Sequence, residues 1–445
     1  MKKNTKKAPE NVLVNNLDLD KDVATLTVNG NTIKLPIVTG TEGERAIDIS
    51  SLRKETGLIT LDPGLVNTAS CTSNITFIDG EKGVIWFRGY PIEDLVRHCS
   101  FLDVAYLLVH GFLPNQKERA NFSELMNLHS LLHEDMRHFF SLFPEAAHPM
   151  AMLSSMVVTL STFYPEMTAN PNEAIDITVT RLLSKFRTIA AFAYKKTKGQ
   201  PVVYPKKEFS YCENLLNMMF WTPVNNYVPD AYINKVLNQL LILHADHGQN
   251  CSTSVVRSVG STDANLYASI SAGVSALWGP KHGGANQSVI EMLETIHNTP
   301  SLTIRKVIER AKDKDDPFKL AGFGHRIYKT YDPRAKIAKE IYHGLVQHLH
   351  FTDPLSRIAE ELEDAALSDP YFQQRHLYPN VDFYTGLSYR AIGIPTNMFT
   401  VFFALGRLPG WIAQWLEMRD GSEHKITRPR QIYIGPKRRS VSSSK

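Results

Sequence analysis

The chain has 445 residues, of which 43% are hydrophobic and 21% are charged, and its formal net charge is +4. This balance excludes wholesale disorder, allows a large core, and at this length favours two or three domains. Part of the small positive charge lies in the tails Met1–Lys7 and Lys437–Lys445, so no nucleic-acid partner is expected. The four cysteines are scattered and form no CxxC pair, which argues against a disulfide framework and favours a cytoplasmic location.

No segment is expected to target or cross a membrane. The basic amino terminus has no apolar run behind it, so it is unlike a secretory signal. The most apolar stretch, Met398–Leu416, is interrupted by Arg407, Pro409 and Gly410, and a charge at mid-bilayer depth is costly. We therefore interpret this stretch as a buried helix pair.

The first hundred residues indicate two β-hairpins. Asn29–Gly30 and Asp79–Gly80 suit tight turns, because Asn, Asp and Gly tolerate the positive φ angles that such turns require. The strands expected beside these turns are Ala24–Val28, Thr32–Leu35, Ile75–Ile78 and Val84–Phe87.

After about residue 90 the apolar residues follow a helical period. Tyr232–Gln249 carries one apolar stripe, and a second stripe follows Gly283–Gly284. Asp332–Pro333 and Asp353–Pro354 each place a capping acid before a proline that suits the first helical position. The sequence therefore predicts a mainly α fold with short β-hairpins near the N-terminus.

The segment His244-Ala-Asp246-His247 is expected on a helix, where residues three apart share a face. Helical histidine pairs do bind zinc, but the HExxH spacing is missing and no further ligand cluster is visible, so no metal site is expected. At least one of the two histidines is expected to be a packed core residue, and a ligand role for His247 stays open.

His282 precedes Gly283 and Gly284, and a helix is expected to begin directly after them. The first N–H groups of a helix are unpaired and suit an anionic ligand, and glycines let the backbone pass close to it. A plain turn with a loop histidine is the alternative, and the residues alone do not decide between the two.

The segment Gly322–Arg334 gathers one imidazole, His325, and three cations, Arg326, Lys329 and Arg334. Like charges repel, so such a cluster needs anionic company. It is either a solvated basic loop or a site for a multiply anionic substrate, because arginine forks match carboxylates with two bonds at a time.

Asp382 lies among apolar and aromatic neighbours in Pro379–Tyr384. It is either the cap of the following helix or a partly desolvated general base. Capping lowers the pKa of a carboxyl and burial raises it, so the direction stays open. Arg407, in an otherwise apolar helix, needs a carboxylate or a substrate as partner, whereas Arg428-Pro-Arg430 is typical of a surface turn.

Together these segments resemble the citrate synthase family. The resemblance rests on five blocks in the family's order, HADHGQN, WGPKHGGAN, GFGHRIYKTYDPR, PNVDFYTG and RPRQIYIG. The β-rich beginning with FRGYPIEDL is similar to the form common in Gram-negative bacteria. The resemblance implies a large helical domain at 91–283 and 387–445, a small helical domain at 284–386, and a β-containing region at 1–90 packed on the large domain.

The resemblance also implies an activity, namely the condensation of acetyl-CoA with oxaloacetate and water to give citrate and CoA. Asp382 would remove a proton from the acetyl-CoA methyl group, and His282 would donate a hydrogen bond to the thioester carbonyl. His325 would hydrogen-bond the oxaloacetate carbonyl and protonate it as the new C–C bond forms. One well-aimed donor of this kind is worth about 3–4 kcal/mol. Neither a cofactor nor a metal is implied, and acetyl-CoA is a co-substrate.

Binding residues follow from the same resemblance. His247, Arg334, Arg407 and Arg428 would hold oxaloacetate and then citrate, and Lys329 is similar to a position that reaches a CoA phosphate. In this family the residue that matches Arg428 comes from the partner subunit, which implies a homodimer or a higher homo-oligomer.

Several alternatives stay open. 2-Methylcitrate synthase uses the same chemistry with propionyl-CoA, and one methyl group changes pocket preference by only about 1–3 kcal/mol. A metal-dependent hydrolase and a non-catalytic helical scaffold are further classes. Some Gram-negative relatives are inhibited by NADH; Arg181 and Lys185 fit that pattern, but Leu128 and Val224 depart from it, so inhibition stays open.

Overall fold

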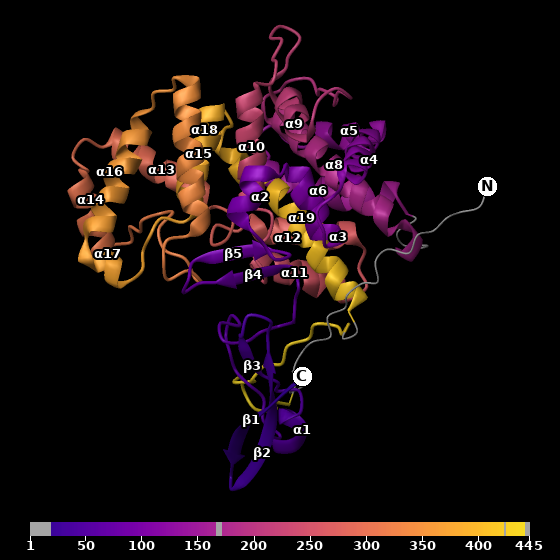
Figure 1. Cartoon of the computed structure of the whole chain (residues 1–445), viewed down its shortest axis with the longest axis vertical. Coiled ribbons are helices and arrows are strands. Elements are labelled where there is room, and N and C mark those ends of the chain that lie inside the picture. The colour runs from indigo at the N-terminus through magenta and orange to yellow at the C-terminus, as the bar shows by residue number, and fades with distance from the viewer. Residues whose placement is uncertain (1–18, 166–170, 422–423, 441–445) are drawn as a thin grey trace, which may run out of the picture. The chain divides into compact units, whose positions relative to one another are not determined.

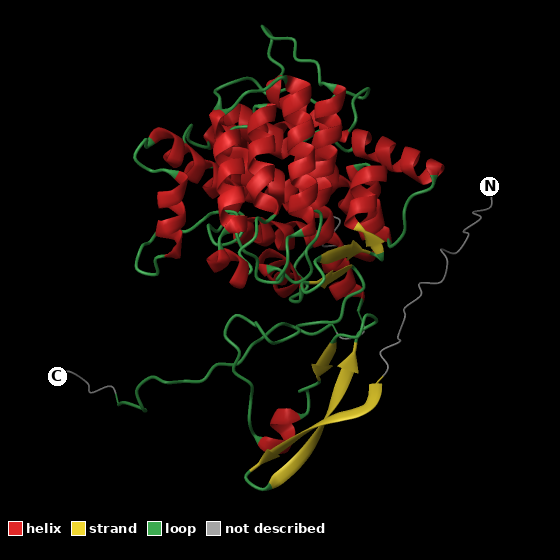
Figure 2. Cartoon of the chain, turned by 60° about the vertical axis from the view of Figure 1, so that its left-hand side comes forward, coloured by secondary structure: helices red, strands yellow, loops and turns green. Residues whose placement is uncertain are grey.

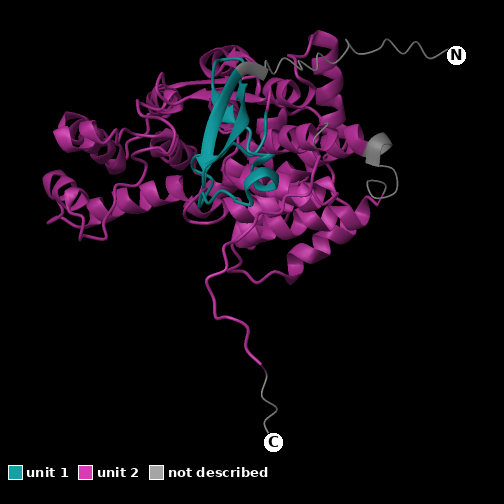
Figure 3. Ribbon diagram, turned by 90° about the horizontal axis from the view of Figure 1, so that it is seen from below, with its two compact units in different colours: residues 1–72 teal, residues 73–445 magenta. Residues whose placement is uncertain are grey.

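The computed structural model describes residues 19–165, 171–421 and 424–440, so the basic segment Met1–Lys7 lies outside the described residues. The described chain is mainly helical and its strands all lie before residue 92, which confirms the predicted fold class (Figure 1) (Figure 2). It divides into two compact units, Met1–Thr72 and Ser73–Lys445 (Figure 3). The division of the helical part into a large and a small domain stays a prediction.

The first unit is a small antiparallel sheet with one short helix, in the order β1-β2-β3. Asn29 and Gly30 form the predicted two-residue turn with φ angles of 52° and 83°, so the first hairpin is confirmed. Ile33, Leu35 and Leu52 form its small core. The elements are β1 (Leu19–Val28), β2 (Asn31–Thr39), β3 (Arg45–Ile47) and α1 (Leu52–Thr56).

The second unit begins with the second predicted hairpin, formed by β4 (Thr76–Asp79) and β5 (Val84–Phe87), with β6 (Tyr90–Pro91) beside β5. Asp79 pairs with Val84, so the turn spans the four residues between them rather than two. Ile85 and Phe87 point from β5 into the core and are fully buried, which anchors the hairpin to the helices.

The rest of this unit is helical (Figure 2). Asp332 and Asp353 cap α15 and α16, and α13 begins after Gly284, as the sequence predicts. The helices are α2 (Ile92–His98), α3 (Phe101–His110), α4 (Gln116–Leu128), α5 (Glu134–Leu142), α6 (Pro149–Phe163), α8 (Pro171–Thr197), α9 (Tyr211–Phe220), α10 (Ala231–Leu243), α11 (Cys251–Gly260), α12 (Leu266–Leu277), α13 (Ala285–Asn298), α14 (Ile304–Lys312), α15 (Pro333–Leu349), α16 (Pro354–Ser368), α17 (Pro370–Gln374), α18 (Val381–Ile392), the 3-10 turn η1 (Thr396–Met398) and α19 (Phe399–Asp420).

The expected helical face shared by His244 and His247 is wrong, because α10 ends at Leu243. The carbonyl of His244 accepts from Arg407 Nε at 2.6 Å, and the carbonyl of Ala245 accepts from the Gly410 N–H at 3.1 Å. Both donors come from α19. The carbonyls of His244 and Ala245 are therefore not available to accept the N–H groups four residues later, as they would if α10 continued. The two histidines therefore lie on the turn after the helix.

The predicted helix pair at Met398–Leu416 is also wrong, since α19 is one helix with Pro409 inside it. A proline has no N–H and usually interrupts a helix. Here the next N–H, that of Gly410, bonds outside the helix, and a Cβ on Gly410 would lie 2.2 Å from the Ala245 oxygen. The helix contacts α3, α8, α10, α11 and α12 and is buried on all sides from Phe399 to Trp415 (Figure 1). Within the described residues no helix is long and apolar enough for a membrane span.

Candidate active site

The turn after α10 holds His247, which is 6% exposed. Its ring centroid lies 5.1 Å from that of His325 and 5.8 Å from that of Tyr328. Its Nε2 has no hydrogen-bond partner among the described residues. Burial, together with the nearby charge of Arg334, lowers the pKa of His247 well below its usual value. A neutral histidine with a free ring nitrogen is therefore available to a ligand.

His325 follows two glycines in the left-handed region, Gly322 and Gly324, with φ angles of 78° and 79°. Its Nδ1 accepts the N–H groups of Ile327 at 3.1 Å and Tyr328 at 3.3 Å. Burial lowers the pKa of His325 to about 4, so the ring is neutral at physiological pH. Because an amide can only donate, Nδ1 carries the lone pair, and the proton lies on Nε2.

The loops that carry His325 and Asp382 are joined by backbone pairing. Phe323 and Pro379 form an isolated antiparallel bridge. The Asn380 N–H donates to a carbonyl of the other loop at 2.8 Å, and a second bond of 2.8 Å runs in the opposite direction. The structure therefore holds the two predicted catalytic residues on adjacent, mutually fixed segments.

Asp382 is the second residue of α18, and the cap of that helix is Asn380, whose side chain accepts from the Asp382 N–H at 3.0 Å. The interpretation of Asp382 as the cap is therefore wrong. Its Oδ1 is buried and has no hydrogen-bond partner among the described residues. Burial raises the pKa of Asp382 to about 6 against the opposing charge of Arg334. Of the two effects that the sequence leaves open, burial is the larger.

Two buried arginines lie close to this carboxyl. Arg334 is held by Asp332 through its Nε at 3.1 Å and its Nη2 at 2.9 Å. Arg407 is 2% exposed and donates from Nε to a backbone carbonyl, but in the described part of the chain it forms no ion pair. Burial lowers the pKa of Arg407 to about 10, so it stays charged at neutral pH. The charges of Asp246 and Asp382 offset only part of its burial, so Arg407 suits an anionic ligand.

His282 lies between α12 and α13, where Ser252 fixes its ring. The Ser252 N–H donates to His282 Nε2 at 3.2 Å, and Ser252 Oγ lies 2.9 Å from the same nitrogen. Ser252 Oγ also accepts from Trp411 Nε1 at 3.1 Å. Burial lowers the pKa of His282 to about 4. The neutral ring thus accepts at Nε2 and carries its proton on Nδ1, which has no acceptor among the described residues and can donate to a ligand.

Ser252 was not predicted as part of the site. The sequence signal was only that it follows the cap of α11, Asn250, by two residues, and such serines are common at helix starts. Its contact with His282 depends on how α11 and the turn after α12 meet, which no local pattern reports.

Four buried polar atoms of this cluster have no hydrogen-bond partner among the described residues. In the described chain, Asp246 Oδ1, His247 Nε2, Tyr328 Oη and Asp382 Oδ1 are all buried without a hydrogen-bond partner. Folded proteins bond nearly all their buried polar atoms, so these four atoms are available to a polar ligand. Arg407 influences the pKa values of His247, His282 and Asp382, which places these groups around one charge.

Two predicted binding residues lie outside this cluster. Arg428 is exposed in the extended segment 424–440. Lys329 is exposed and forms an ion pair with Glu81 in the β4–β5 turn, while its N–H donates to the Gly80 carbonyl at 3.0 Å. Their roles remain predictions that need a partner subunit or a bound CoA.

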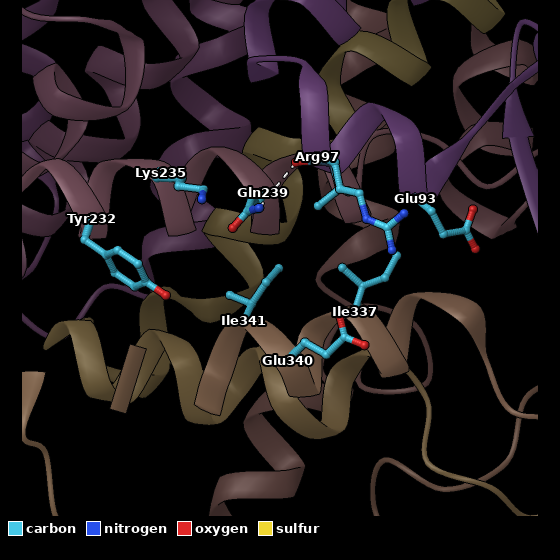
Figure 4. Close-up of a pocket in the computed structure, with 9 residues that line it drawn as sticks. Glu93, Arg97, Tyr232, Lys235, Gln239, Ile337, Glu340 and Ile341 are labelled. Atoms are coloured by element: carbon cyan, nitrogen blue, oxygen red, sulfur yellow. Dashed lines mark hydrogen bonds between the residues drawn. The ribbon is translucent and has the colours of Figure 1, made fainter. Parts of the chain in front are cut away.

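Two adjoining cavities of about 190 and 550 Å³ lie between α2 and α15 and share Glu93, Arg97, Ile337 and Glu340 in their walls. Figure 4 shows Glu93 and Arg97 of α2 across the smaller cavity from Ile337 and Glu340 of α15, with Gln239 of α10 to one side. The wall of the smaller cavity is more polar than apolar, whereas that of the larger cavity is more apolar than polar. Both include Ile337 and Glu340, which follow Arg334 on α15. Within the described residues, no group of three or more His, Cys, Asp or Glu side chains is arranged to hold a metal ion.

Comparison with known proteins extends over most of the chain. A family model described as "Citrate synthase, C-terminal domain" matches residues 64–430. Citrate synthase 1 of Mycobacterium tuberculosis is 51% identical over 415 residues, which cover 93% of this chain and 96% of the relative.

Solved structures agree with this match. The crystal structure of citrate synthase from Pyrobaculum aerophilum has a TM-score of 0.77 and 36% identity, and the match covers 91% of this chain and 96% of that one. The citrate synthase of Thermoplasma acidophilum, solved as a ternary complex with carboxymethyl coenzyme A and oxaloacetate, has a TM-score of 0.77 and 29% identity over 86% of this chain and 98% of that one. The chain belongs to the citrate synthase family and is an enzyme of the transferase class.

Proposed function

We propose that this enzyme condenses acetyl-CoA with oxaloacetate and water to give citrate and CoA, the reaction that feeds the tricarboxylic acid cycle. The observation that carries the proposal is that Arg334 and Arg407, both buried, act on the Asp382 carboxyl, while Arg334 also acts on the neighbouring rings of His247 and His325. Oxaloacetate is a dicarboxylate, so it supplies the negative charge that Arg407 lacks. The ligands of the Thermoplasma acidophilum complex support the same substrate pair.

The first chemical step is removal of a methyl proton from acetyl-CoA by the Asp382 carboxylate. A pKa of about 6 makes this carboxylate a stronger base than an exposed one, while most of it is still ionised at neutral pH. The thioester α-proton is far less acidic than a carboxyl group, so the oxygen that gains charge must be stabilised at once. The free Nδ1–H of His282 supplies that hydrogen bond.

The second step joins the methyl carbon to the ketone carbon of oxaloacetate. The C=O electron pair moves to oxygen, and the Nε2–H of His325 donates the proton that converts this oxygen to the hydroxyl of citryl-CoA. Water then cleaves the thioester and releases citrate and CoA. Both proton transfers of the condensation are thus assigned to a residue whose tautomer or pKa fits the task.

Substrate binding divides between one subunit and its partner. We infer that His247, Arg334 and Arg407 hold oxaloacetate, and that Arg428 reaches the site of a neighbouring subunit in a homo-oligomer. Exposure of Arg428 in a single chain supports this role. Lys329 would exchange Glu81 for a CoA phosphate. The proposed location is the cytoplasm.

Finer assignments stay predictions. These are the form common in Gram-negative bacteria and the inhibition by NADH. Lys185 is buried and donates to the Leu131 carbonyl, and burial lowers its pKa to about 8, whereas Leu128 and Val224 are exposed. Lys185 would have to leave this carbonyl in order to bind a phosphate.

A thiol-release assay on the purified enzyme tests the proposal. We expect release of CoA that depends on oxaloacetate, with a higher kcat/KM for acetyl-CoA than for propionyl-CoA. A higher value for propionyl-CoA assigns the enzyme to 2-methylcitrate synthesis. Release of CoA at the same rate with and without oxaloacetate contradicts both citrate synthesis and 2-methylcitrate synthesis. Repeating the assay with NADH tests the inhibition.

A further inference from the structure

One carboxylate, that of Asp332, joins the starts of two helices. Its side chain is 1% exposed and caps α15. Its Oδ1 accepts the Arg334 N–H at 2.9 Å and Arg334 Nε at 3.1 Å. Its Oδ2 accepts Arg334 Nη2 at 2.9 Å and the Val381 N–H at 3.2 Å. Only the first of these bonds is needed for capping.

The additional bonds fix two groups of the site at once. Val381 is the first residue of α18 and directly precedes Asp382. Arg334 is held by a two-bond fork, which fixes the plane of its guanidinium and leaves Nη1 for a ligand. In the described part of the chain, no other carboxylate forms an ion pair with Arg334.

We propose that Asp332 is a positioning residue of the condensation, which orients Arg334 toward the dicarboxylate and fixes the start of α18 beneath Asp382. This inference rests on the proposed function. Asp332 acts through Arg334 and Val381, because both oxygens of its carboxylate are already occupied by protein donors.

The charge of Asp332 has a separate effect on the base. Burial raises the pKa of Asp382, Arg334 and Arg407 oppose this, and Asp332 adds to it. Tyr389 also lies on α18, and the negative charge of Asp382 contributes to raising its pKa. Removal of the negative charge at Asp332 is therefore expected to lower the pKa of Asp382 and to weaken it as a base.

Asp353 offers a matched control in the same chain. It caps α16 from an identical Asp-Pro pair, accepts the Leu355 N–H at 3.0 Å and bonds Arg390 Nε at 2.7 Å. Its side chain is 5% exposed, so it is also buried. It shares capping, burial and an arginine contact with Asp332. Among the described residues it contacts α18 only through Arg390 in the last turn of that helix, and it contacts neither Arg334 nor Val381 at the start.

The experiment compares D332N with D353N by kinetics and thermal unfolding. For D332N we expect the KM for oxaloacetate to rise by about 10- to 100-fold, as for loss of charge-assisted hydrogen bonds. The acid limb of kcat should move to lower pH by on the order of one unit. For D353N we expect a lower Tm with both quantities unchanged. D332E keeps the charge but displaces the fork, so it should raise KM without moving the acid limb.

Two results overturn the proposal. One is a D332N enzyme that loses Tm as D353N does while its KM and acid limb match those of the wild type. The other, decisive if D332N does not fold, is a D332E enzyme with unchanged KM. The rise in Tm with oxaloacetate alone, measured for wild type and variants, reports how well Arg334 binds oxaloacetate in the absence of any acyl-CoA. Absence of turnover in the wild type overturns the proposed function instead, and this is seen before any variant is compared.

Discussion

The properties of Asp382 follow from burial at a helix start. A carboxyl at the second position of a helix normally gains from nearby N–H groups, which lowers its pKa. Here the Asn380 side chain takes the Asp382 N–H, and the Asp382 oxygen is left without a donor. The sequence shows the helix start and the apolar neighbours, but not how completely other elements cover the carboxyl. For that reason the sequence predicts the residue but not the direction of its pKa shift.

The D382N enzyme should keep its fold and its affinity for oxaloacetate but lose the base. We expect kcat to fall by about 100- to 10,000-fold, the usual contribution of a positioned general base. Steady-state kinetics measure the fall, and the shift of Tm with oxaloacetate serves as the control for binding. Turnover near the wild-type value would refute the assigned base.

The wild-type pH profile should show the titration of the same group. Because Asp382 acts as a carboxylate, kcat should fall on the acid side with a midpoint near the folded-state pKa of about 6. A midpoint near 4 in the enzyme–substrate complex would mean that the carboxyl is not desolvated as the structure indicates. The measurement is kcat against pH at saturating concentrations of both substrates.

Stability should depend on pH through Asp382 as well. Its folded pKa of about 6 lies above the ordinary aspartate pKa of 3.8, so the folded state binds this proton more tightly than the unfolded state does. Stability from this group is therefore greatest below pH 3.8, falls between pH 3.8 and 6, and is lower by about 3 kcal/mol above that range. The D382N enzyme should thus be more stable than the wild type at pH 7.5, but not at pH 4. Urea unfolding at both pH values measures this, and an equal difference at both would contradict it.

At the scale of elements, the sequence succeeds where the signals are local. The turn at Asn29–Gly30, the caps Asp332 and Asp353 and the start of α13 all depend on neighbouring residues, and all are confirmed. The predictions of a longer α10 and of a break in α19 are wrong, because each outcome depends on hydrogen bonds between α19 and the turn after α10. The hydrophobic periodicity of one segment carries no information about hydrogen-bond donors that belong to a different segment of the chain.

Gly322 gives an element-scale prediction. It has a φ of 78°, and a Cβ there would lie 2.6 Å from Val289 Cγ2. G322A should therefore lower stability by more than about 2 kcal/mol, through strain and overpacking, and should also reduce kcat because the His325 loop shifts. Chemical denaturation and kinetics measure both effects.

Gly393 is the matched control for this substitution. It caps α18 with a φ of 90°, and nothing lies within 4 Å of an added Cβ. G393A should cost about 1 kcal/mol from backbone strain alone and leave kcat unchanged. Equal effects of the two substitutions on kcat would show that the packing around Gly322 does not hold the His325 loop.

At the scale of the whole molecule, the described chain presents all but one of the predicted oxaloacetate ligands in one cluster. The remaining one, Arg428, is exposed and lies in an extended segment. The resemblance to the family implies that Arg428 comes from a second subunit. No sequence pattern within one chain, however, specifies where a neighbouring subunit lies. This part of the site could not be derived from composition, period or spacing.

Subunit mixing tests the assignment of Arg428. R428A and D382N homo-oligomers should each be nearly inactive, but in a mixed dimer one site combines an intact Asp382 with an intact Arg428. After random reassociation at equal amounts, half of the dimers are mixed and one of their two sites is complete, so about a quarter of the wild-type activity should return. Recovery that does not exceed the sum of the two parents would show that Arg428 serves its own subunit or none.

The backbone bridge between Phe323 and Pro379 has a consequence for motion. It ties the segments of His325 and Asp382 into one rigid block, so a hinge movement of that block carries the acid and the base together. His282 is anchored separately, through Ser252 and Trp411 on α11 and α19. Displacement of the block would therefore separate Asp382 from His282 but leave the distance between Asp382 and His325 unchanged. The enzyme would then be inactive in an open conformation and active only when the block has closed onto His282.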